Sequence, residues 1–279
     1  MRLASVCRYR VSFRTLMTIP IFQVDAFTHQ LFSGNPAAVC LLKNDPTDDW
    51  LRNVAAEMNL SETAFLVKEG NGFRLRWFTP KVEVDICGHA TLASAHVLWD
   101  EGILREDQPA RFWTLSGELI VRKKGNWIEL DFPVEPSQSC EVPNLLLHVL
   151  PERRLYIGKN RMDYLVMLES EEMVQSFNPD LNRLAMVETR GLIVTAPSAS
   201  SEYDFVSRFF APSVGIDEDP VTGSAHCCLG PFWSERLNKA EMAARQLSSR
   251  GGTLRVRVEN QRVYISGQAI TVFRGNLGV

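Results

Sequence analysis

Two stretches of the chain place a glycine at the start of an expected helix, among side chains that can do chemistry. One runs from Cys87 to Ala90 (Cys-Gly-His-Ala) and the other from Thr222 to Ala225 (Thr-Gly-Ser-Ala). A helix N-terminus presents unpaired backbone N–H groups and the positive end of the helix dipole. Glycine lets a ligand come close to that backbone. Gly88 and Gly223 therefore predict two places where a carboxylate or phosphate can bind without a lysine.

Three acids, Asp217, Glu218 and Asp219, precede the second glycine. Negative side chains before a helix favour its dipole, so capping alone explains at least two of them. Asp219 is the nearest to the helix, and Pro220 restricts its backbone. We expect Asp219 to orient an amine or hydroxyl of a ligand, beside Ser224.

His89 lies where the helix dipole disfavours an imidazolium, so we expect a neutral imidazole, with a capping or packing role as an equal alternative. Glu62 lies where an amphipathic helix gives way to an apolar strand. Taken alone, such a glutamate is better explained as a solvated surface residue. Cys87 could be a thiolate because the helix field lowers a thiol pKa, although a lone cysteine more often packs.

The elements that carry these residues occur twice in the same order: a strand, a loop, the glycine, a helix and a hairpin. Gly88 and Gly223 are 223 − 88 = 135 residues apart, and Gly117 and Gly252 are 252 − 117 = 135 apart. This shared offset predicts an internal duplication into two α+β halves that face each other, against the alternative of coincidence. A Pro-rich linker is expected over residues 131–143. We expect an N-terminal half at 19–134, which includes the start of this stretch, and a C-terminal half at 144–279.

Composition fits a globular protein, with 45% hydrophobic and 23% charged residues. The net charge of −3 favours neither a nucleic-acid nor a membrane partner, and no apolar run reaches the roughly 18 residues of a membrane span. Six scattered cysteines suit reduced thiols and a cytoplasmic location. The histidine spacing indicates no metal site.

Residues 1–17 carry four arginines and no acid. A transit peptide has this composition, but we favour an upstream extension that is disordered, with Met17 as the functional start.

Four motifs together resemble the PhzF-like (phenazine biosynthesis-like) family, from about Ile19 to the end of the chain: "VDAFT…FSGNPAAV", "EMNLSETAF", "LRWFTPKVEVDICGHATLASAHVL" and "FAPSVGIDEDPVTGSAHC". The resemblance implies a diaminopimelate-epimerase-like fold of two pseudo-symmetric halves. Each half is then a curved, mostly antiparallel sheet around a central helix, and the last strand can pack back on the N-terminal half. It also implies a homodimer that needs no cofactor.

By the same resemblance, Glu62 is the catalytic acid/base, and His89, Asp219 and Ser224 orient and polarise the substrate between Gly88 and Gly223. The implied function is a cofactor-independent isomerase that moves a proton within a small carboxylic acid.

Two alternatives remain open. An amino-acid racemase or epimerase would use Cys87, but it needs a second thiol where Thr222 stands, and an ordinary hydroxyl cannot replace a thiolate base. A non-catalytic interaction protein on the same scaffold is the other.

Overall fold

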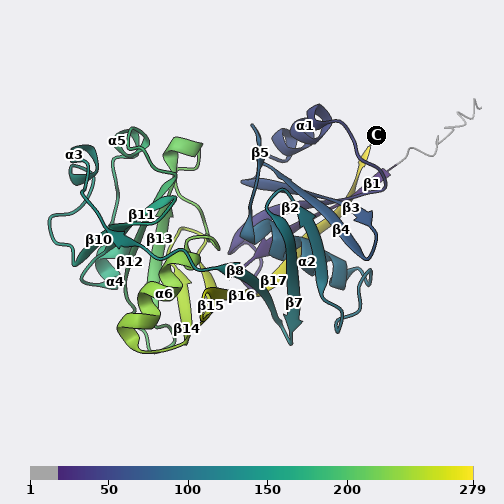
Figure 1. Ribbon diagram of the computed structural model, residues 1–279. Helices are drawn as coiled ribbons and strands as arrows, with labels where there is room; N and C mark the ends of the chain where they lie inside the picture. Colours follow the sequence, from purple (N-terminus) through teal and green to yellow (C-terminus); the bar gives the residue numbers. More distant parts are fainter. Residues whose placement is uncertain (1–17, 279) are drawn as a thin grey trace, which may run out of the picture.

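A computed structural model describes residues 18–278 of the chain, so the expected N-terminal extension lies outside the described residues. The chain forms two lobes that lie side by side (Figure 1). Their strands belong to one hydrogen-bonded network of 17 strands. None of the helices within residues 18–278 has the length and apolar character needed to cross a membrane.

The N-terminal lobe surrounds helix α2 (Gly88–Asp100), of which almost every residue is buried. Alanine and serine occupy much of this helix, and such small side chains let strands approach it from several sides. Its walls are β1 (Thr18–Ala26), β2 (Asn35–Leu42), β3 (Glu62–Glu69), β4 (Gly72–Phe78), the two-residue β5 (Glu83–Val84), β6 (Ala110–Thr114), β7 (Gly117–Lys124) and β8 (Trp127–Pro133).

Helix α1 (Asp48–Met58) lies outside this sheet and sets the start of β3. Asn59 ends α1 in the left-handed conformation, with φ 51°. The chain then enters β3 at Glu62, parallel to β2, with Ala37 opposite Glu62. Asn35 and Glu62 therefore both lie where neighbouring parallel strands begin.

The C-terminal lobe surrounds helix α6 (His226–Leu237). Gly230 faces three valines of β15 and β16, and a Cβ there would lie 3.0–3.3 Å from them, so glycine permits the close packing. The strands are β10 (Tyr156–Lys159), β11 (Asp163–Met167), β12 (Gly191–Pro197), β13 (Phe205–Phe210), β14 (Glu241–Gln246), β15 (Gly252–Glu259) and β16 (Arg262–Gly267). Short helices α3 (Asn144–Leu147), α4 (Glu171–Ser176), α5 (Leu181–Ala185) and η1 (Pro212–Val214) lie around them.

Two strand pairings join the lobes. β8 pairs with β16 in antiparallel fashion. The last strand, β17 (Ala269–Gly278), returns to the N-terminal lobe and pairs with β1, with Thr18 opposite Gly278 (Figure 1). The lobes are therefore parts of one continuous sheet system.

The landmarks of the expected repeat occupy similar places. Gly117 begins β7 and Gly252 begins β15, and each strand forms a hairpin with the next. The expected linker needs correction, because its first three residues belong to β8 and Gln138–Ser139 form β9, which pairs with β10. Backbone hydrogen bonding therefore extends into this Pro-rich stretch from both lobes.

Candidate active site

The two glycines lie against each other where the lobes meet. A Cβ added to Gly88 would lie 3.5 Å from the Cα of Gly223 and 4.0 Å from the backbone nitrogen of Ser224. Gly88 begins α2, whose first turn carries no acidic side chain and whose N-cap, Cys87, makes no side-chain cap hydrogen bond. The N-terminus of α2 thus opens directly onto the backbone of the other lobe.

Helix α6 begins at His226, three residues later than the sequence predicted. The N–H groups of His226, Cys227 and Cys228 bond the carbonyls three residues before them, which makes a tight turn over residues 223–225. The first N–H groups of such a turn have no partner within it, so the amides of Gly223 and Ser224 keep the role predicted for a helix mouth.

Glu62 and His89 face each other in the wall of this junction. Glu62 Oε2 lies 3.2 Å from His89 Nε2, and the two residues are 9% and 5% exposed. The angles are not those of a hydrogen bond, and neither atom has another partner among the described residues. Two buried polar atoms therefore lie here without a hydrogen-bond partner from residues 18–278.

The expectation of a neutral His89 needs correction. Burial lowers the pKa of His89, but Cys87 and Glu62 beside it raise it more, and the net direction is well above the usual value. The prediction considered only the helix dipole. It could not include the Glu62 carboxylate, which lies on strand β3.

The pKa of Cys87 also runs against the sequence expectation. Burial and the nearby Glu62 raise it, although contact with His89 opposes them. Cys87 Sγ lies 3.6 Å from His89 Nδ1. Ligand atoms of Cys87, His89 and Glu62 all lie within 4.8 Å of one another, so this cluster has the residue types that bind Zn²⁺. Sequence spacing missed it because Glu62 is remote in the chain.

Asp219 is held by side chains from both lobes. Its Oδ1 accepts a hydrogen bond from Asn35 Nδ2 at 2.8 Å, and its Oδ2 accepts one from Thr222 Oγ1 at 2.5 Å. Gln246 Nε2 donates to the Asp219 carbonyl at 2.8 Å. Burial raises the pKa of the Asp219 carboxyl. The other two acids lie elsewhere, because Asp217 is exposed and Glu218 pairs with Arg208.

Asn35 connects these groups and was not predicted. Its Nδ2 donates to Asp219 and to the Val221 carbonyl at 2.9 Å, and lies 3.2 Å from His89 Nδ1. Asn35 is fully buried and belongs to the N-terminal lobe, whereas Asp219 and Val221 belong to the C-terminal lobe. Its motif, "FSGNP", was noted only for the family likeness.

Ser224 contacts a second unpredicted residue, Arg190. Arg190 Nη1 donates to Ser224 Oγ at 2.9 Å. The same guanidinium forms a two-pronged pair with Asp163, through Nε at 2.8 Å and through Nη2. A fixed cation thus lies at the second helix mouth.

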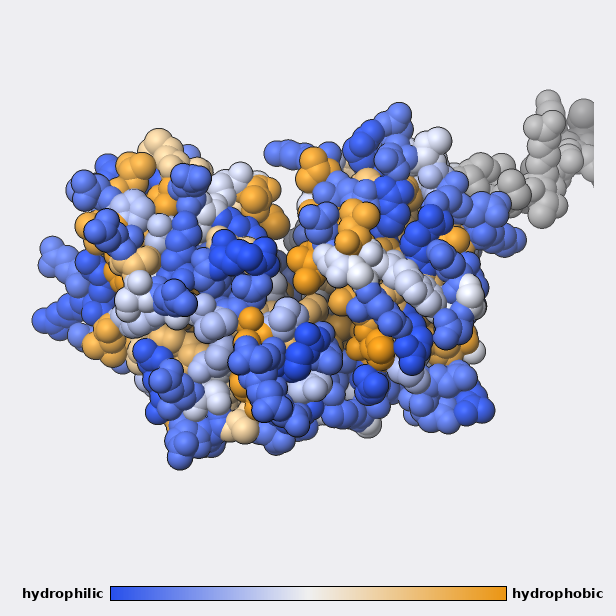
Figure 2. All heavy atoms as spheres, in the orientation of Figure 1, coloured by the Kyte–Doolittle hydropathy of each residue, from blue (hydrophilic) through white to orange (hydrophobic). Residues whose placement is uncertain are grey.

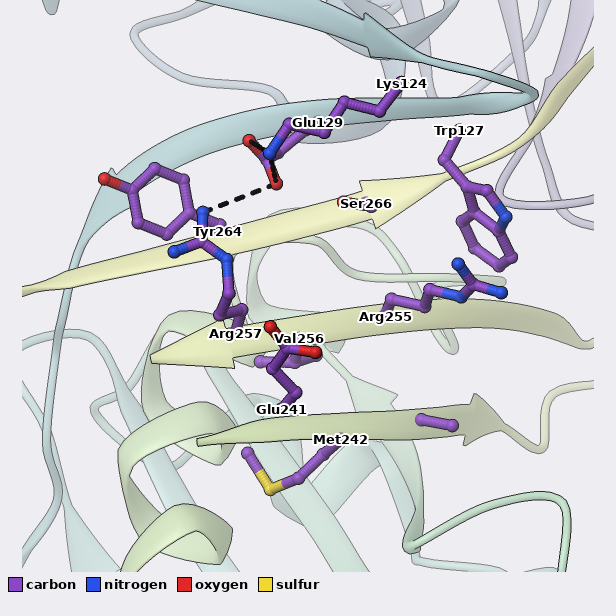
Figure 3. Close-up of a pocket in the computed structure, with 11 residues that line it drawn as sticks. Lys124, Trp127, Glu129, Glu241, Met242, Arg255, Val256, Arg257, Tyr264 and Ser266 are labelled. Carbon is purple, nitrogen blue, oxygen red and sulfur yellow. Dashed lines mark hydrogen bonds and ion pairs between the residues drawn. The ribbon is translucent and has the colours of Figure 1, made fainter. Parts of the chain in front are cut away.

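A cavity of about 410 Å³ is a separate feature. It lies over β7, β8 and β14–β16 (Figure 3). Its lining contains none of the predicted site residues; it consists of Lys124, Trp127, Glu129, Glu241, Met242, Ala243, Arg255, Val256, Arg257, Tyr264 and Ser266. The surface is hollowed where the two lobes meet (Figure 2). The predicted residues lie along that junction, largely buried.

Comparison with known proteins identifies the family of the chain. The family model for phenazine biosynthesis-like protein matches residues 24–275. The chain therefore belongs to the phenazine biosynthesis-like (PhzF) family.

A protein of Halalkalibacterium halodurans named as an uncharacterized isomerase is 55% identical over 94% of this chain and 99% of its own length. The crystal structure of a PhzF-family protein from Enterococcus faecalis superposes with a TM-score of 0.90 at 42% identity, over 94% of this chain and 100% of that one. A probable proline racemase from Agrobacterium radiobacter shares the fold, with a TM-score of 0.63 at 10% identity over 94% and 93% of the chains. The predicted α+β, epimerase-like fold is confirmed.

Proposed function

We propose that the protein is a cofactor-independent isomerase that moves a proton within a small carboxylic acid. The observation that carries this proposal is the Glu62–His89 pair, held 3.2 Å apart beside the place where Gly88 and Gly223 meet. A carboxyl that we propose transfers the proton thus lies near two sets of backbone amides. The names of relatives as isomerases support the same class of reaction.

In the proposed reaction, the amides at the two helix mouths hold the substrate carboxylate and the negative charge that spreads over it. The Glu62 carboxylate takes a proton from one carbon, which leaves a delocalised carbanion and a neutral Glu62 carboxylic acid. The same proton then returns to a different carbon, and Glu62 is a carboxylate again. Such general acid/base catalysis contributes typically about 10² to 10⁴ in rate.

His89 and Asp219 have supporting roles in this proposal. His89 Nε2 lies 3.2 Å from Glu62 Oε2, so the imidazole can position the Glu62 carboxyl and bond the substrate beside it. Asp219, fixed by Asn35 and Thr222, accepts a hydrogen bond from an amine or hydroxyl of the substrate. Ser224 lies at the second mouth, where it can donate to the substrate.

The racemase alternative is weaker than the isomerase proposal. It requires two thiol bases on opposite faces of the substrate, and Thr222 occupies the second position. Thr222 Oγ1 is already engaged with Asp219. Cys87, the remaining thiol, has a pKa raised by burial, which disfavours the thiolate.

The test uses a panel of small carboxylic acids in D₂O, followed by ¹H NMR for exchange of carbon-bound hydrogen or for double-bond migration. We expect wild type to turn over at least one acid and Glu62→Gln to lose that turnover while still binding the acid. Glu69→Gln, at the exposed end of the same strand, is the matched control. Full turnover by Glu62→Gln contradicts the proposal, and loss of turnover only in Cys87→Ser favours the racemase.

Family membership also leads us to propose a homodimer in solution, which sedimentation equilibrium measures directly.

A further inference from the structure

Arg190 lies in the C-terminal lobe at a place that corresponds closely to that of Glu62 in the N-terminal lobe. β2 and β3 run parallel, with Ala37 opposite Glu62, and β11 and β12 run parallel, with Asp163 opposite Gly191. In the next antiparallel pairing of each lobe, Thr63 faces Phe78 and Leu192 faces Phe210. Gly191 thus corresponds to Glu62, and Arg190 precedes it by one residue.

The guanidinium of Arg190 is held in a fixed orientation. Asp163 is fully buried and binds Nε and Nη2, while Phe209 lies under the guanidinium, 5.3 Å from its central carbon to the ring centre. Together with the bond to Ser224, these contacts use three of the five N–H donors of the guanidinium. The Arg190 side chain is 26% exposed, and two N–H donors of its guanidinium remain unused within residues 18–278.

The carboxyl groups around the junction explain why an anionic substrate would need a cation there. Glu62 and Asp219 both carry carboxyl groups, and an anionic substrate between the lobes would be repelled by them when they are ionised. Arg190 lies on the C-terminal side of the junction, bonded to Ser224 at the second helix mouth, and guanidinium groups bind carboxylates with two parallel hydrogen bonds.

We propose that Arg190 binds the carboxylate of the substrate together with Ser224, in the C-terminal lobe. The carbons that lose and gain the proton then face Glu62 and His89 in the N-terminal lobe. This polarity limits the substrate to two classes of small acid. In one, the hydrogen that is transferred lies at the opposite end of a short carbon skeleton from the carboxylate. In the other, that hydrogen lies on a carbon that is conjugated with the carboxylate. The polarity rests on the proposed function, whereas carboxylate binding by Arg190 does not.

The test compares benzoate with benzamide, two probes of the same shape of which only one is charged, by isothermal titration calorimetry. We expect wild type to bind benzoate more tightly than benzamide. Arg190→Gln raises the Kd for benzoate at least about tenfold and leaves that for benzamide unchanged, because it removes charged hydrogen bonds only. Arg161→Gln, which removes a charge from an exposed ion pair with Glu135, is the matched control and leaves both constants unchanged.

Arg190→Gln leaves Asp163 buried without a partner, so folding is checked with further variants. Asp163→Asn/Arg190→Gln removes both charges and is expected to lose benzoate binding with a near-native melting temperature. Asp163→Asn alone removes the competing carboxylate and is expected to bind benzoate as well as wild type or better. A merely structural role for Arg190 predicts instead that all three variants weaken benzoate and benzamide alike.

The inference is overturned if benzoate fails to bind wild type, or binds Arg190→Gln as tightly as wild type. If that occurs while Glu62→Gln still loses proton transfer, the proposed function stands without this carboxylate site. If Arg190→Gln loses benzoate while Glu62→Gln retains full turnover, the carboxylate site stands and the isomerase proposal fails.

Discussion

Gly88 and Gly223 face each other across the junction of the lobes, so that a side chain on either would touch the other: a Cβ on Gly88 would lie 3.5 Å from the Gly223 Cα, and a Cβ on Gly223 would lie 3.6 Å from the Gly88 Cα. Neither glycine has a positive φ. The absence of a side chain therefore matters here for the space between the helix mouths and not for backbone conformation.

Replacing Gly88 by alanine tests whether the space between the two helix mouths is needed for an anion to bind. The added methyl fits at ordinary contact distance but lies 4.0 Å from the Ser224 nitrogen, over the proposed anion site. We expect Gly88→Ala to melt within a few degrees of wild type and to weaken benzoate about tenfold, because it covers amides that would otherwise bind the anion. Calorimetry and thermal melting measure the two effects. Gly275→Ala, where a Cβ meets nothing nearer than 3.8 Å, is the control, and equal affinities in both variants would contradict the assignment.

Asn35→Asp should show how strongly Asn35 couples the lobes. The new carboxylate would face Asp219 Oδ1 and the Val221 carbonyl at 2.8 and 2.9 Å, with no hydrogen to donate. We expect the free energy of unfolding at neutral pH to fall by about 3 kcal/mol, because two buried acceptors lose their donor.

The sign of the pH dependence follows from the same contact. Burial and Asp219 would raise the pKa of the introduced carboxyl, so the folded state binds a proton more readily than the unfolded state does. The loss in the free energy of unfolding therefore becomes smaller as pH falls. Urea unfolding at several pH values measures this. Asn126→Asp, which adds the same charge to an exposed turn, should have little effect at any pH; a similar cost in both variants would refute the coupling.

His226 should make the protein sensitive to acid. Burial lowers its pKa to about 4, although its contact with the Thr222 carbonyl opposes the shift. Between the ordinary histidine pKa of about 6.5 and that value, the unfolded chain binds a proton that the folded chain does not, so stability falls with falling pH by about 3 kcal/mol from this group. In urea unfolding, we expect His226→Gln to remove this part of the dependence of the free energy of unfolding on pH. The exposed control, His148→Gln, should leave that dependence in place. Identical pH slopes in wild type and His226→Gln would disprove the attribution.

His89 contributes to stability in the opposite direction. Its raised folded pKa means that its stabilising protonation is complete below about 6.5 and is lost as pH rises through the higher folded value.

Arg250, between β14 and β15, is expected to stabilise the junction by bonding to the N-terminal lobe. It donates to Asp25 Oδ1 at 2.8 Å and to the carbonyls of Ser33 and Gly34 at 3.0 and 2.8 Å. Asp25 is 1% exposed, so Arg250→Met leaves a buried charge unpaired and should lower the free energy of unfolding by about 3 kcal/mol.

A double-mutant cycle isolates the Arg250 pair. Asp25→Asn/Arg250→Met should recover part of the lost stability, because both charges are then absent. Arg262→Met breaks the exposed pair with Asp131 and should cost no more than about 1 kcal/mol. Purely additive effects at Asp25 and Arg250 would show that the pair does not couple the lobes.

Sequence reasoning predicted the positions of the glycines and acids because they occur in motifs with defined spacing, but it could not predict which side chains touch. Glu62 alone resembled a surface residue, and its contact with His89 depends on how β3 packs beside α2. Asn35 belongs to a Gly-Asn-Pro step, a pattern typical of a turn, and Arg190 belongs to no motif. The start of α6 was misplaced because the turn before it has nearly helical geometry.

The pairing of β1 with β17 has a consequence for how the protein is made. β1 precedes β17 in the chain, with all of the C-terminal lobe between them. During synthesis, the N-terminal lobe therefore has one unpaired sheet edge, along β1, until β17 (Ala269–Gly278) has been made. A nascent chain stalled before Ala269 has the proposed catalytic glutamate but lacks the strand that completes the sheet around it.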